Sequence, residues 1–209
     1  MERKIKKILS CRSKACIEDP RFRRAAVLIP LFKKDGEYHI LFTRRTERVA
    51  HHKGQISFPG GRQDKKDKNL LATALREARE EMGIEEKDVR ILGELDDICT
   101  VASDFCVSPF VALIPYPYPY KVNLQEIEEV IEVPLLALFD ERKFRQEVRV
   151  KDGEPLLVYF YQYGNHTIWG ATARILKQLL DLLPEADKKK LKRKPQGVPS
   201  RHHDSEDMA

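Results

Sequence analysis

Short apolar runs bounded by turn residues recur along the chain, and each run predicts a strand. The predicted strands cover residues 25–32, 38–43, 55–58, 89–95, 107–114, 126–135, 144–150 and 156–163. Asp-Gly pairs at 35–36 and 152–153 predict that the first two and the last two of these strands form hairpins. The segment PYPYPY at 115–120 predicts a rigid extended loop, because proline lacks the amide donor that a central strand needs.

Two longer segments carry apolar residues at helical spacing. Within residues 69–82, positions 71, 74, 75, 78 and 82 are apolar and form one stripe that would pack on a sheet. Asp67 is the expected N-cap of this helix, and Gly83 followed by Ile84 fits a left-handed C-cap. Residues 167–183 have the same periodicity, and Pro184 is expected to end that helix. Shorter helices are expected near the N-terminus and at 135–139.

Mixed strands with two long helices favour an α/β fold. We expect an α/β/α sandwich in which one helix covers each face of a mixed sheet. At 209 residues the chain is long enough for one sizeable core with appendages. We divide it into an N-terminal helical extension at 1–22, a main domain at 23–183, and a basic, disordered tail at 184–209.

Composition excludes some classes of protein. Charged residues make up 34% of the chain, and no apolar run approaches the roughly 20 residues that span a bilayer. Because the N-terminus also lacks the apolar core of a secretory signal, a cytoplasmic protein is the simplest interpretation. The four cysteines, at 11, 16, 99 and 106, have no CxxC spacing and are expected to be reduced. Part of the net charge of +5 lies in KKKLKRK at 188–194, usually a solvated tail, with nucleic-acid or membrane-surface contact as the alternative.

The centre of the chain combines a glycine pair with an acidic helix. Glu77, Glu80 and Glu81 are spaced i, i+3 and i+4, so the predicted helix gathers them within one arc of its surface. Neighbouring carboxylates repel one another unless a cation lies between them, and Mg²⁺ or Mn²⁺ is typical of phosphate chemistry. Charged residues more often only solvate a helix face. Gly60 and Gly61 allow a close approach to another backbone or to a phosphate.

This centre resembles the signature of the Nudix hydrolases, G-x5-E-x7-R-E-U-x-E-E-x-G-U, in which U is apolar. The matching residues are Gly61, Arg76, Glu77, Ala78, Glu80, Glu81, Gly83 and Ile84. Two features depart from it: Asp67 stands where the signature has glutamate, and eight residues instead of seven separate that position from Arg76. The departures leave open whether Asp67 is a metal ligand or a helix cap.

One branch of that family, the coenzyme A pyrophosphatases, is similar over roughly residues 23–183. The chain carries LFTRRT at 41–46, HHKGQISFPGG at 51–61, TALREA at 73–78 and IWGATARILKQLL at 168–180. The longer spacing before Arg76 also resembles this branch. Ala50 stands where the branch commonly has arginine, and Phe42 replaces an aliphatic residue. These differences weaken the resemblance to the branch more than the resemblance to the family.

The resemblance implies a hydrolase in which carboxylates hold Mg²⁺ or Mn²⁺ and an activated water attacks a phosphorus of a diphosphate. It makes Glu77 and Glu81 metal ligands and Glu80 a ligand or the general base. Arg76 is expected to orient a glutamate through a bidentate contact. The expected substrate-binding residues, which could instead order the loops, are Arg45, His52, Gln55, Gly60 and Gly61.

For coenzyme A or acyl-CoA, the products would be 3′,5′-ADP and 4′-phosphopantetheine or its acyl form. The tyrosines of PYPYPY could stack on the adenine or line a pantetheine channel, but packing at the solvent edge is commoner. Alternative substrates are ADP-ribose, NADH and dinucleoside polyphosphates, and a different alternative is a non-catalytic module that binds nucleotides or RNA. Nucleic acid is not the expected partner. The acyl preference, the number of metal ions, the general base and the oligomeric state, including a homodimer, stay open.

Overall fold

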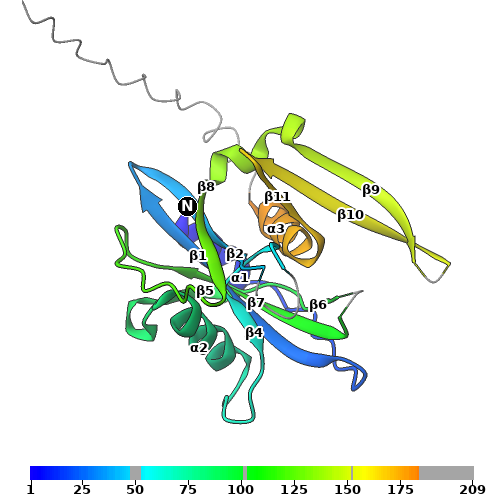
Figure 1. Cartoon of the computed structure of the whole chain (residues 1–209), viewed down its shortest axis with the longest axis horizontal. Coiled ribbons are helices and arrows are strands. Elements are labelled where there is room, and N and C mark those ends of the chain that lie inside the picture. Colours follow the sequence, from blue (N-terminus) through cyan, green and yellow to red (C-terminus); the bar gives the residue numbers. More distant parts are fainter. Residues whose placement is uncertain (48–52, 101–102, 152, 184–209) are drawn as a thin grey trace, which may run out of the picture.

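The structure is a computed structural model, and it describes residues 1–47, 53–100, 103–151 and 153–183. Within these ranges the main element is an eight-stranded mixed sheet of order β3-β2-β1-β7-β5, with β4, β6 and β8 pairing at its sides (Figure 1). Its strands are β1 (Arg23–Lys34), β2 (Glu37–Arg45), β3 (Ile56–Ser57), β4 (Gly60–Arg62), β5 (Arg90–Glu94), β6 (Ile98–Cys99), β7 (Phe105–Leu113) and β8 (Ile127–Pro134). The α-helices are α1 (Glu2–Ser10), α2 (Leu70–Met82) and α3 (Gly170–Leu182).

The central strand is β1, which lies between β2 and β7. It pairs antiparallel with β2, where Leu31 is opposite Ile40, and parallel with β7, where Leu28 is opposite Phe110. Almost all residues from 25 to 32 are buried, as expected for a strand that is covered on both faces of its sheet. The predicted opening hairpin is confirmed.

One long helix covers each face of this sheet. Neighbouring residues of β1 point to opposite faces, so they pack against different helices. Leu28 belongs to the same apolar cluster as Ala78 of α2. The next residue, Ile29, belongs to the cluster that contains Leu176 of α3. The predicted α/β/α sandwich with a mixed sheet is therefore confirmed.

The ends of α2 confirm one predicted cap and correct the other. Gly83 has the left-handed conformation, with φ of 68°, and its amide donates to the carbonyls of Ala78 and Arg79. The N-cap is Asn69, whose side chain accepts a hydrogen bond from the amide of Ala72 at 2.8 Å. The prediction that Asp67 caps this helix is wrong. Asp67 lies two residues further out, where its carboxylate is used for another purpose described below.

The start of α3 also differs from the prediction. Residues 166–169 form strand β11 (His166–Trp169), in which Trp169 pairs with Phe160 and Ile168 with Tyr161 of β10 (Glu154–Tyr163). The helix begins only at Gly170, because the pairing with β10 holds the preceding residues in an extended conformation. Apolar periodicity could not locate this boundary, since Ile168 is buried in either arrangement. The short strands β4 and β6 were also not predicted, and they contain only three and two residues.

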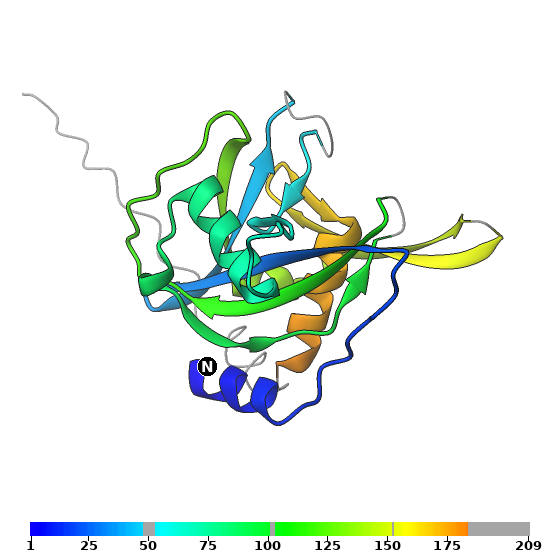
Figure 2. The ribbon, with the colours of Figure 1, turned by 90° about the horizontal axis from the view of Figure 1, so that it is seen from below.

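A second, three-stranded sheet has the order β11-β10-β9, where β9 is Phe144–Lys151. Its β9–β10 hairpin, which was predicted, extends away from the body of the molecule (Figures 1 and 2). Helix α3 lies between this sheet and the large one. After β8, the 3₁₀ helices η2 (Leu135–Phe139) and η3 (Glu141–Lys143) connect the large sheet to the small one. The helix η2 confirms the short helix predicted at 135–139. A further 3₁₀ turn, η1 (Glu86–Asp88), follows α2.

The N-terminal extension packs on the domain. Helix α1 buries Ile5 and Leu9 beside β5 (Figure 2). The segment that follows is held by the buried carboxylate of Asp97, which lies 2.9 Å from Lys14 Nζ and 3.0 Å from Arg24 Nη2. The helix predicted in residues 1–22 is therefore present. The predicted tail at 184–209 lies outside the described residues.

Residues 115–120 contain no regular element, as predicted, and their tyrosines pack beside the sheet. Tyr116 stacks on Phe32 with ring centroids 5.2 Å apart, and the Tyr118 hydroxyl donates to Asp88 at 2.8 Å. None of the residues in this loop lines the cleft described below, so the alternative role as a ligand channel finds no support.

Two further predictions concern membrane spans and cysteines. Across the described ranges, every helix is too short or too polar to cross a bilayer. All four cysteines are free thiols: Cys11 and Cys16 are exposed, Cys99 is partly buried and Cys106 is buried.

Candidate active site

The most buried charged side chain of the acidic helix is Glu81, which is only 2% exposed. One carboxylate oxygen lies 3.3 Å from Arg45 Nη1, at the end of β2. The other accepts a hydrogen bond from the amide of Gly60 at 3.3 Å. Arg45 and Gly60, which the sequence predicts to bind substrate, therefore contact Glu81, a predicted metal ligand.

Gly60 and Gly61 make this approach possible. Strand β4 pairs antiparallel with β1, with Gly60 opposite Val27. A Cβ at Gly60 would lie 2.4 Å from the carbonyl oxygen of Ala26, and its φ of 155° disfavours other residues. A Cβ at Gly61 would lie 2.6–2.8 Å from the carboxylate atoms of Glu77. The glycine pair thus places bare backbone against Glu77 and Glu81.

Burial dominates the electrostatics of these two carboxylates. It raises the pKa of Glu81 to about 8, and the charge of Glu77 adds to the shift, whereas Arg45 and the Gly60 amide oppose it. Burial also raises the pKa of Glu77, against the lowering effect of Arg76. A cation bound beside these two carboxylates would favour their ionised forms and so oppose the effect of burial on both pKa values.

Arg76 is the centre of an ion-pair network on the outer side of the helix. Its Nε and Nη2 atoms contact both oxygens of Asp67, at 3.0 and 3.1 Å. It also reaches Glu77 at 2.8 Å and Glu80 at 2.9 Å. The bidentate contact is therefore made with Asp67, and each glutamate receives a single contact, so that Arg76 connects three carboxylates at once.

Asp67 serves as the anchor of this network. Besides Arg76, its carboxylate accepts hydrogen bonds from the Thr73 hydroxyl at 3.0 Å and from the Asp64 amide at 2.9 Å. The hydrogen bond from Arg76 holds the pKa of Asp67 below its usual range, despite the opposing effect of burial. Both carboxylate oxygens of Asp67 accept contacts from protein groups. These contacts fit a residue that positions Arg76 better than they fit a metal ligand or a helix cap.

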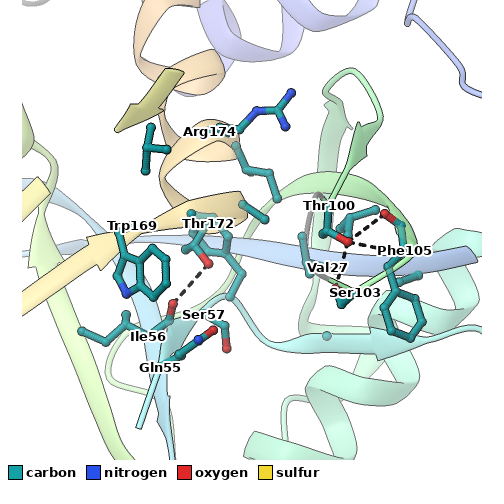
Figure 3. A pocket seen from close by; sticks show the side chains of 18 of the residues that line it. Val27, Gln55, Ile56, Ser57, Thr100, Ser103, Phe105, Trp169, Thr172 and Arg174 are labelled. Atoms are coloured by element: carbon teal, nitrogen blue, oxygen red, sulfur yellow. Dashed lines mark hydrogen bonds between the residues drawn. The ribbon is translucent and has the colours of Figure 1, made fainter. Parts of the chain in front are cut away.

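A cleft of about 880 Å³ opens beside the glycine pair, between the large sheet, the β9–β10 hairpin and α3 (Figure 3). Four of the five predicted substrate-binding residues line it: Arg45, Gln55, Gly60 and Gly61. The fifth, His52, lies outside the described residues. The Thr172 hydroxyl donates to the carbonyl of Ile56 at 3.1 Å and joins α3 to β3 at the cleft wall.

Away from the glycine pair the wall of the cleft is mainly apolar. Its apolar residues include Val27, Ile56, Phe58, Phe105, Val107, Leu156, Leu157, Val158, Trp169 and Ile175. Trp169 is 41% exposed, and it faces the cleft from the end of β11 (Figure 3). No local pattern in the sequence marks this wall, because its residues come from six separated segments and only the fold brings them together.

Glu126 is a further acidic residue of the site that sequence reasoning missed. It lines the cleft, and its carboxylate lies 3.7 Å from Arg45 Nη2. Its negative charge contributes to the raised pKa values of both Glu77 and Glu81. In the sequence it is one of several acidic residues in EIEEVIEV, and nothing distinguishes it from its neighbours there.

Known proteins resemble this chain in the same region. A model of the NUDIX domain matches residues 22–109. The protein NudL of Photorhabdus laumondii, an uncharacterized Nudix hydrolase, is 40% identical over 157 residues, which are 75% of this chain and 83% of that protein. This chain belongs to the Nudix family. A NudL protein of Yersinia pestis is 38% identical and covers 75% of this chain and 78% of its own length.

The Nudix fold is also found among solved structures. A MutT/nudix family protein from Enterococcus faecalis matches 79% of this chain and 63% of its own, with a TM-score of 0.52. Its sequence identity of 14% restricts this likeness to the fold. The NudL relatives show that the chain is a Nudix hydrolase, and members of this family generally require divalent cations such as Mg²⁺ or Mn²⁺.

The donor chemistry of this Nudix site fits such a cation. Glu77 and Glu81 are hard oxygen donors on one helix, and the glycine pair leaves space beside Glu77 that any side chain would fill. Glu80 differs, because its half-exposed carboxylate is turned to Arg76. In the described part of the chain, no three acidic, histidine or cysteine side chains are already gathered around one point. A metal would therefore draw its ligands together on binding.

Proposed function

We propose that this Nudix hydrolase cleaves the diphosphate of coenzyme A or acyl-CoA, and releases 3′,5′-ADP and 4′-phosphopantetheine or its acyl form. The main support is the composition of the cleft. Its polar end holds Arg45, Gly60 and Gly61, next to the acidic helix, and its remaining wall is mainly apolar. A diphosphate at the polar end would leave the pantetheine arm, or an acyl chain attached to it, along the apolar wall.

We assign Glu77 and Glu81 as the metal ligands, with Glu80 as a further ligand or the general base. A bound Mg²⁺ or Mn²⁺ ion would neutralise charge on the diphosphate oxygens and lower the pKa of a water molecule. The general base would accept the proton of the attacking water, whose oxygen would bond to phosphorus while the bridging oxygen leaves with the other phosphate. Arg76 holds Glu77 and Glu80 in place from the anchor Asp67. Glu126, which lines the cleft beside Arg45, is a fourth acid and an alternative acceptor of the proton.

Substrate binding is assigned to the predicted residues around the polar end. Gln55 offers an amide at the cleft wall, and the backbone amides of Gly60 and Gly61 lie next to the acidic helix. Arg45 pairs with Glu81 and Glu126, and a diphosphate can compete for its guanidinium. His52 is assigned by the motif alone. The free thiols fit the cytoplasmic location proposed from the sequence.

Two other functions make different predictions. A Nudix pyrophosphatase for ADP-ribose, NADH or dinucleoside polyphosphates would use the same polar end, and Ala50 keeps this alternative open. It would have less use for an extended apolar wall. A non-catalytic module that binds nucleotides or RNA would bind without turnover, and its affinity would fall when residues 188–194 are removed.

Product analysis separates these functions. The purified chain is incubated with Mg²⁺ or Mn²⁺ and, in parallel, with coenzyme A, an acyl-CoA, ADP-ribose and NADH, and the products are resolved by chromatography. Release of 3′,5′-ADP from coenzyme A or its acyl form at the highest kcat/KM supports the proposal. Cleavage of ADP-ribose without release of 3′,5′-ADP overturns it in favour of the second function, and binding without any turnover favours the third.

Trp169 provides an independent binding signal, because it is the single tryptophan of the chain and lies in the apolar wall. We expect coenzyme A to change its fluorescence in a Glu81→Gln variant that no longer turns substrate over. ADP-ribose has no pantetheine arm and should change the fluorescence less. Equal responses would contradict the placement of the arm along this wall.

A further inference from the structure

Two of the four cysteines face each other on neighbouring strands of the large sheet. Cys99 ends β6 and Cys106 lies in β7, and the two residues are direct partners in the antiparallel pairing of these strands (Figure 1). The other two cysteines, Cys11 and Cys16, are exposed and belong to no strand. The facing pair does not have the spacing of a CxxC motif, so only the strand pairing reveals it.

The hydrogen bonds of this ladder determine how close the two side chains come. The amide of Thr100 donates to the carbonyl of Phe105 at 2.7 Å, so this bond lies beside the pair of Cys99 and Cys106 and not within it. In an antiparallel ladder such a pair is of the non-hydrogen-bonded kind, with Cα atoms about 4.5 Å apart and side chains close together. Disulfides join Cα atoms that are about 4.4–6.8 Å apart, so the strand pairing already provides a distance in that range.

The two thiols also interact with each other. Burial raises the pKa of the Cys106 thiol to about 12, and a hydrogen bond with the Cys99 side chain adds to this shift. The Cys106 thiol donates to the carbonyl of Ile17 at 3.9 Å. Arg24 Nη1 donates to the same carbonyl, which would therefore keep a donor if the thiol lost its hydrogen.

This pair of cysteines lies next to the cleft. Thr100 and Phe105, which follow and precede the two cysteines, both line the cleft, and the Thr100 hydroxyl accepts a hydrogen bond from the Phe105 amide at 3.1 Å (Figure 3). Arg174 of α3 is another lining residue, and it donates to the carbonyl of Cys99 at 3.2 Å. A bond between the two sulfur atoms would therefore fix β6 to β7 where both strands reach the cleft wall.

We propose that Cys99 and Cys106 form a reversible disulfide, which makes this strand pair a site of redox modification beside the cleft. Cys99 is partly buried and Cys106 is only 1% exposed, so a small oxidant would reach Cys99 first. In a reducing cytoplasm both thiols would be free at rest, and the bond would form only under oxidising conditions. This disulfide would form whichever substrate the cleft binds.

Thiol–disulfide exchange with a small disulfide, such as oxidised glutathione, would form the bond in two steps. The Cys99 thiol loses its proton to solvent, and its sulfur attacks one sulfur of oxidised glutathione, whose own bond breaks and releases one glutathione thiolate. The Cys106 thiol then loses its proton, and its sulfur attacks Cys99 Sγ and releases the second glutathione thiolate. Arg24 Nη1, 3.5 Å from Cys106 Sγ, favours the thiolate needed there. The two cysteines are thus oxidised, and oxidised glutathione is reduced to two thiols.

Intact-mass spectrometry tests for this bond in a background where the exposed Cys11 and Cys16 are replaced by serine. After incubation with oxidised glutathione, the mass of the folded protein should fall by two hydrogen atoms, and a reductant should restore it. A folded protein that stays reduced, that carries glutathione on both cysteines, or that forms the disulfide only after it is unfolded would overturn the proposal.

Two single variants in the same background separate the roles of the two thiols. Cys106→Ala should retain one glutathione on Cys99, because no second thiol is present to release it. Cys99→Ala should react with oxidised glutathione at least about 10-fold more slowly, because its remaining thiol is buried. Equal rates for the two variants would contradict the order of the two steps, and with it the placement of the two thiols.

Thermal unfolding tests whether the native strand pair accommodates the bond. A disulfide restricts the unfolded chain, so the oxidised protein should have a Tm about 5 °C or more above that of the reduced protein. Cys99→Ala is the matched control, and its Tm should not respond to oxidised glutathione. A lower Tm after oxidation would show that the bond forms only by distorting the strands, and it would contradict the pairing geometry on which the proposal rests.

Discussion

The guanidinium of Arg45 lies 3.3 Å from the carboxylate of Glu81, although 36 positions separate the two residues in the sequence. The contact joins the end of β2 to the last turn of α2, and Arg45 also lines the cleft. The Arg45 guanidinium and the Gly60 amide thus each contact one carboxylate oxygen of Glu81. These two contacts partly offset the cost of burying its charge. Protonation of Glu81 therefore competes with the metal binding that we propose for it.

We expect Glu81→Gln to reduce kcat by about 10²-fold or more, because the variant loses an anionic metal ligand but keeps the shape of the side chain. The fold should be retained. The measurements are kcat at saturating Mg²⁺ or Mn²⁺ and the circular dichroism spectrum. Glu80→Gln is the matched control on the same helix, and as a half-exposed residue it should cost less unless it is the base. Full activity of Glu81→Gln at saturating metal would contradict the assignment.

The raised pKa of Glu81 predicts how the stability of the metal-free protein depends on pH. Its pKa is about 8 in the fold and near its ordinary value of 4.5 in the unfolded chain. Between these values the folded protein holds a proton that the unfolded chain has lost. The free energy of unfolding should therefore fall as the pH rises through this window, and the contribution is fully present only below the lower value.

Urea unfolding in a chelator, at several pH values in that window, measures this dependence. Glu81→Gln cannot ionise, so its stability should fall less with pH than that of the wild type. On the proposed assignment Mg²⁺ or Mn²⁺ competes with this proton, so its stabilising effect on the wild type should grow as the pH rises through the window. Parallel pH profiles for the two chelated proteins would show that Glu81 does not titrate in this range.

The layers of the fold could be predicted because the strongest patterns in the sequence are local. The apolar run in β1 and the helical stripe of α2 each determine their own element and the face that it buries. The start of α3 could not be predicted, because β10 is the partner that holds residues 166–169 extended. Asn69 and Asp67 are both good caps by residue type, and only the competing contacts of Asp67 with Arg76 decide between them.

The candidate active site also has one part that the sequence predicts and one part that depends on the fold. The acidic helix and the glycine pair were predictable, because their spacing alone brings the carboxylates together and the family signature includes both. The network of Arg76 was predicted only in part, since the bidentate partner is Asp67 and not a glutamate. Glu126 and the apolar wall around Trp169 depend on contacts between distant segments. No local pattern in the sequence marks them.

Asp67→Asn tests the anchor of the Arg76 network. The variant keeps the size of the side chain but loses the charge that accepts two contacts from Arg76, and hydrogen bonds to charged groups contribute about 1.5–3 kcal/mol. We expect a loss of stability in that range at neutral pH, and a fall in activity of about 10- to 100-fold, as for other residues that orient metal ligands.

The measurements are urea unfolding and kcat/KM as a function of metal concentration. Because the pKa of Asp67 is held low in the fold, its stabilising effect should disappear as the pH falls through that pKa. Wild type and variant should therefore become equally stable in strong acid. A variant with normal activity and reduced stability would limit Asp67 to a structural role.

The two glycines should respond differently to alanine, although they are neighbours. At Gly60 the new Cβ would meet backbone, the Ala26 carbonyl at 2.4 Å, at a φ of 155° that alanine rarely adopts. Gly60→Ala should therefore lower the melting temperature clearly. At Gly61 the Cβ would meet only the carboxylate of Glu77, at 2.6–2.8 Å, and that end of the side chain can move. Gly61→Ala should keep the melting temperature and weaken metal binding by about 10- to 100-fold, because the displaced ligand no longer faces its ion.

Thermal unfolding in a chelator and a titration of activity with Mn²⁺ separate these two effects. If Gly61→Ala unfolded as easily as Gly60→Ala, the glycine would be needed for the strand and not for the ligand. If its metal dependence matched that of the wild type, Glu77 would not be a ligand. A partial return of metal affinity in Gly61→Ala combined with Glu77→Asp, whose shorter side chain leaves room for the new methyl group, would identify the collision with Glu77 as the cause.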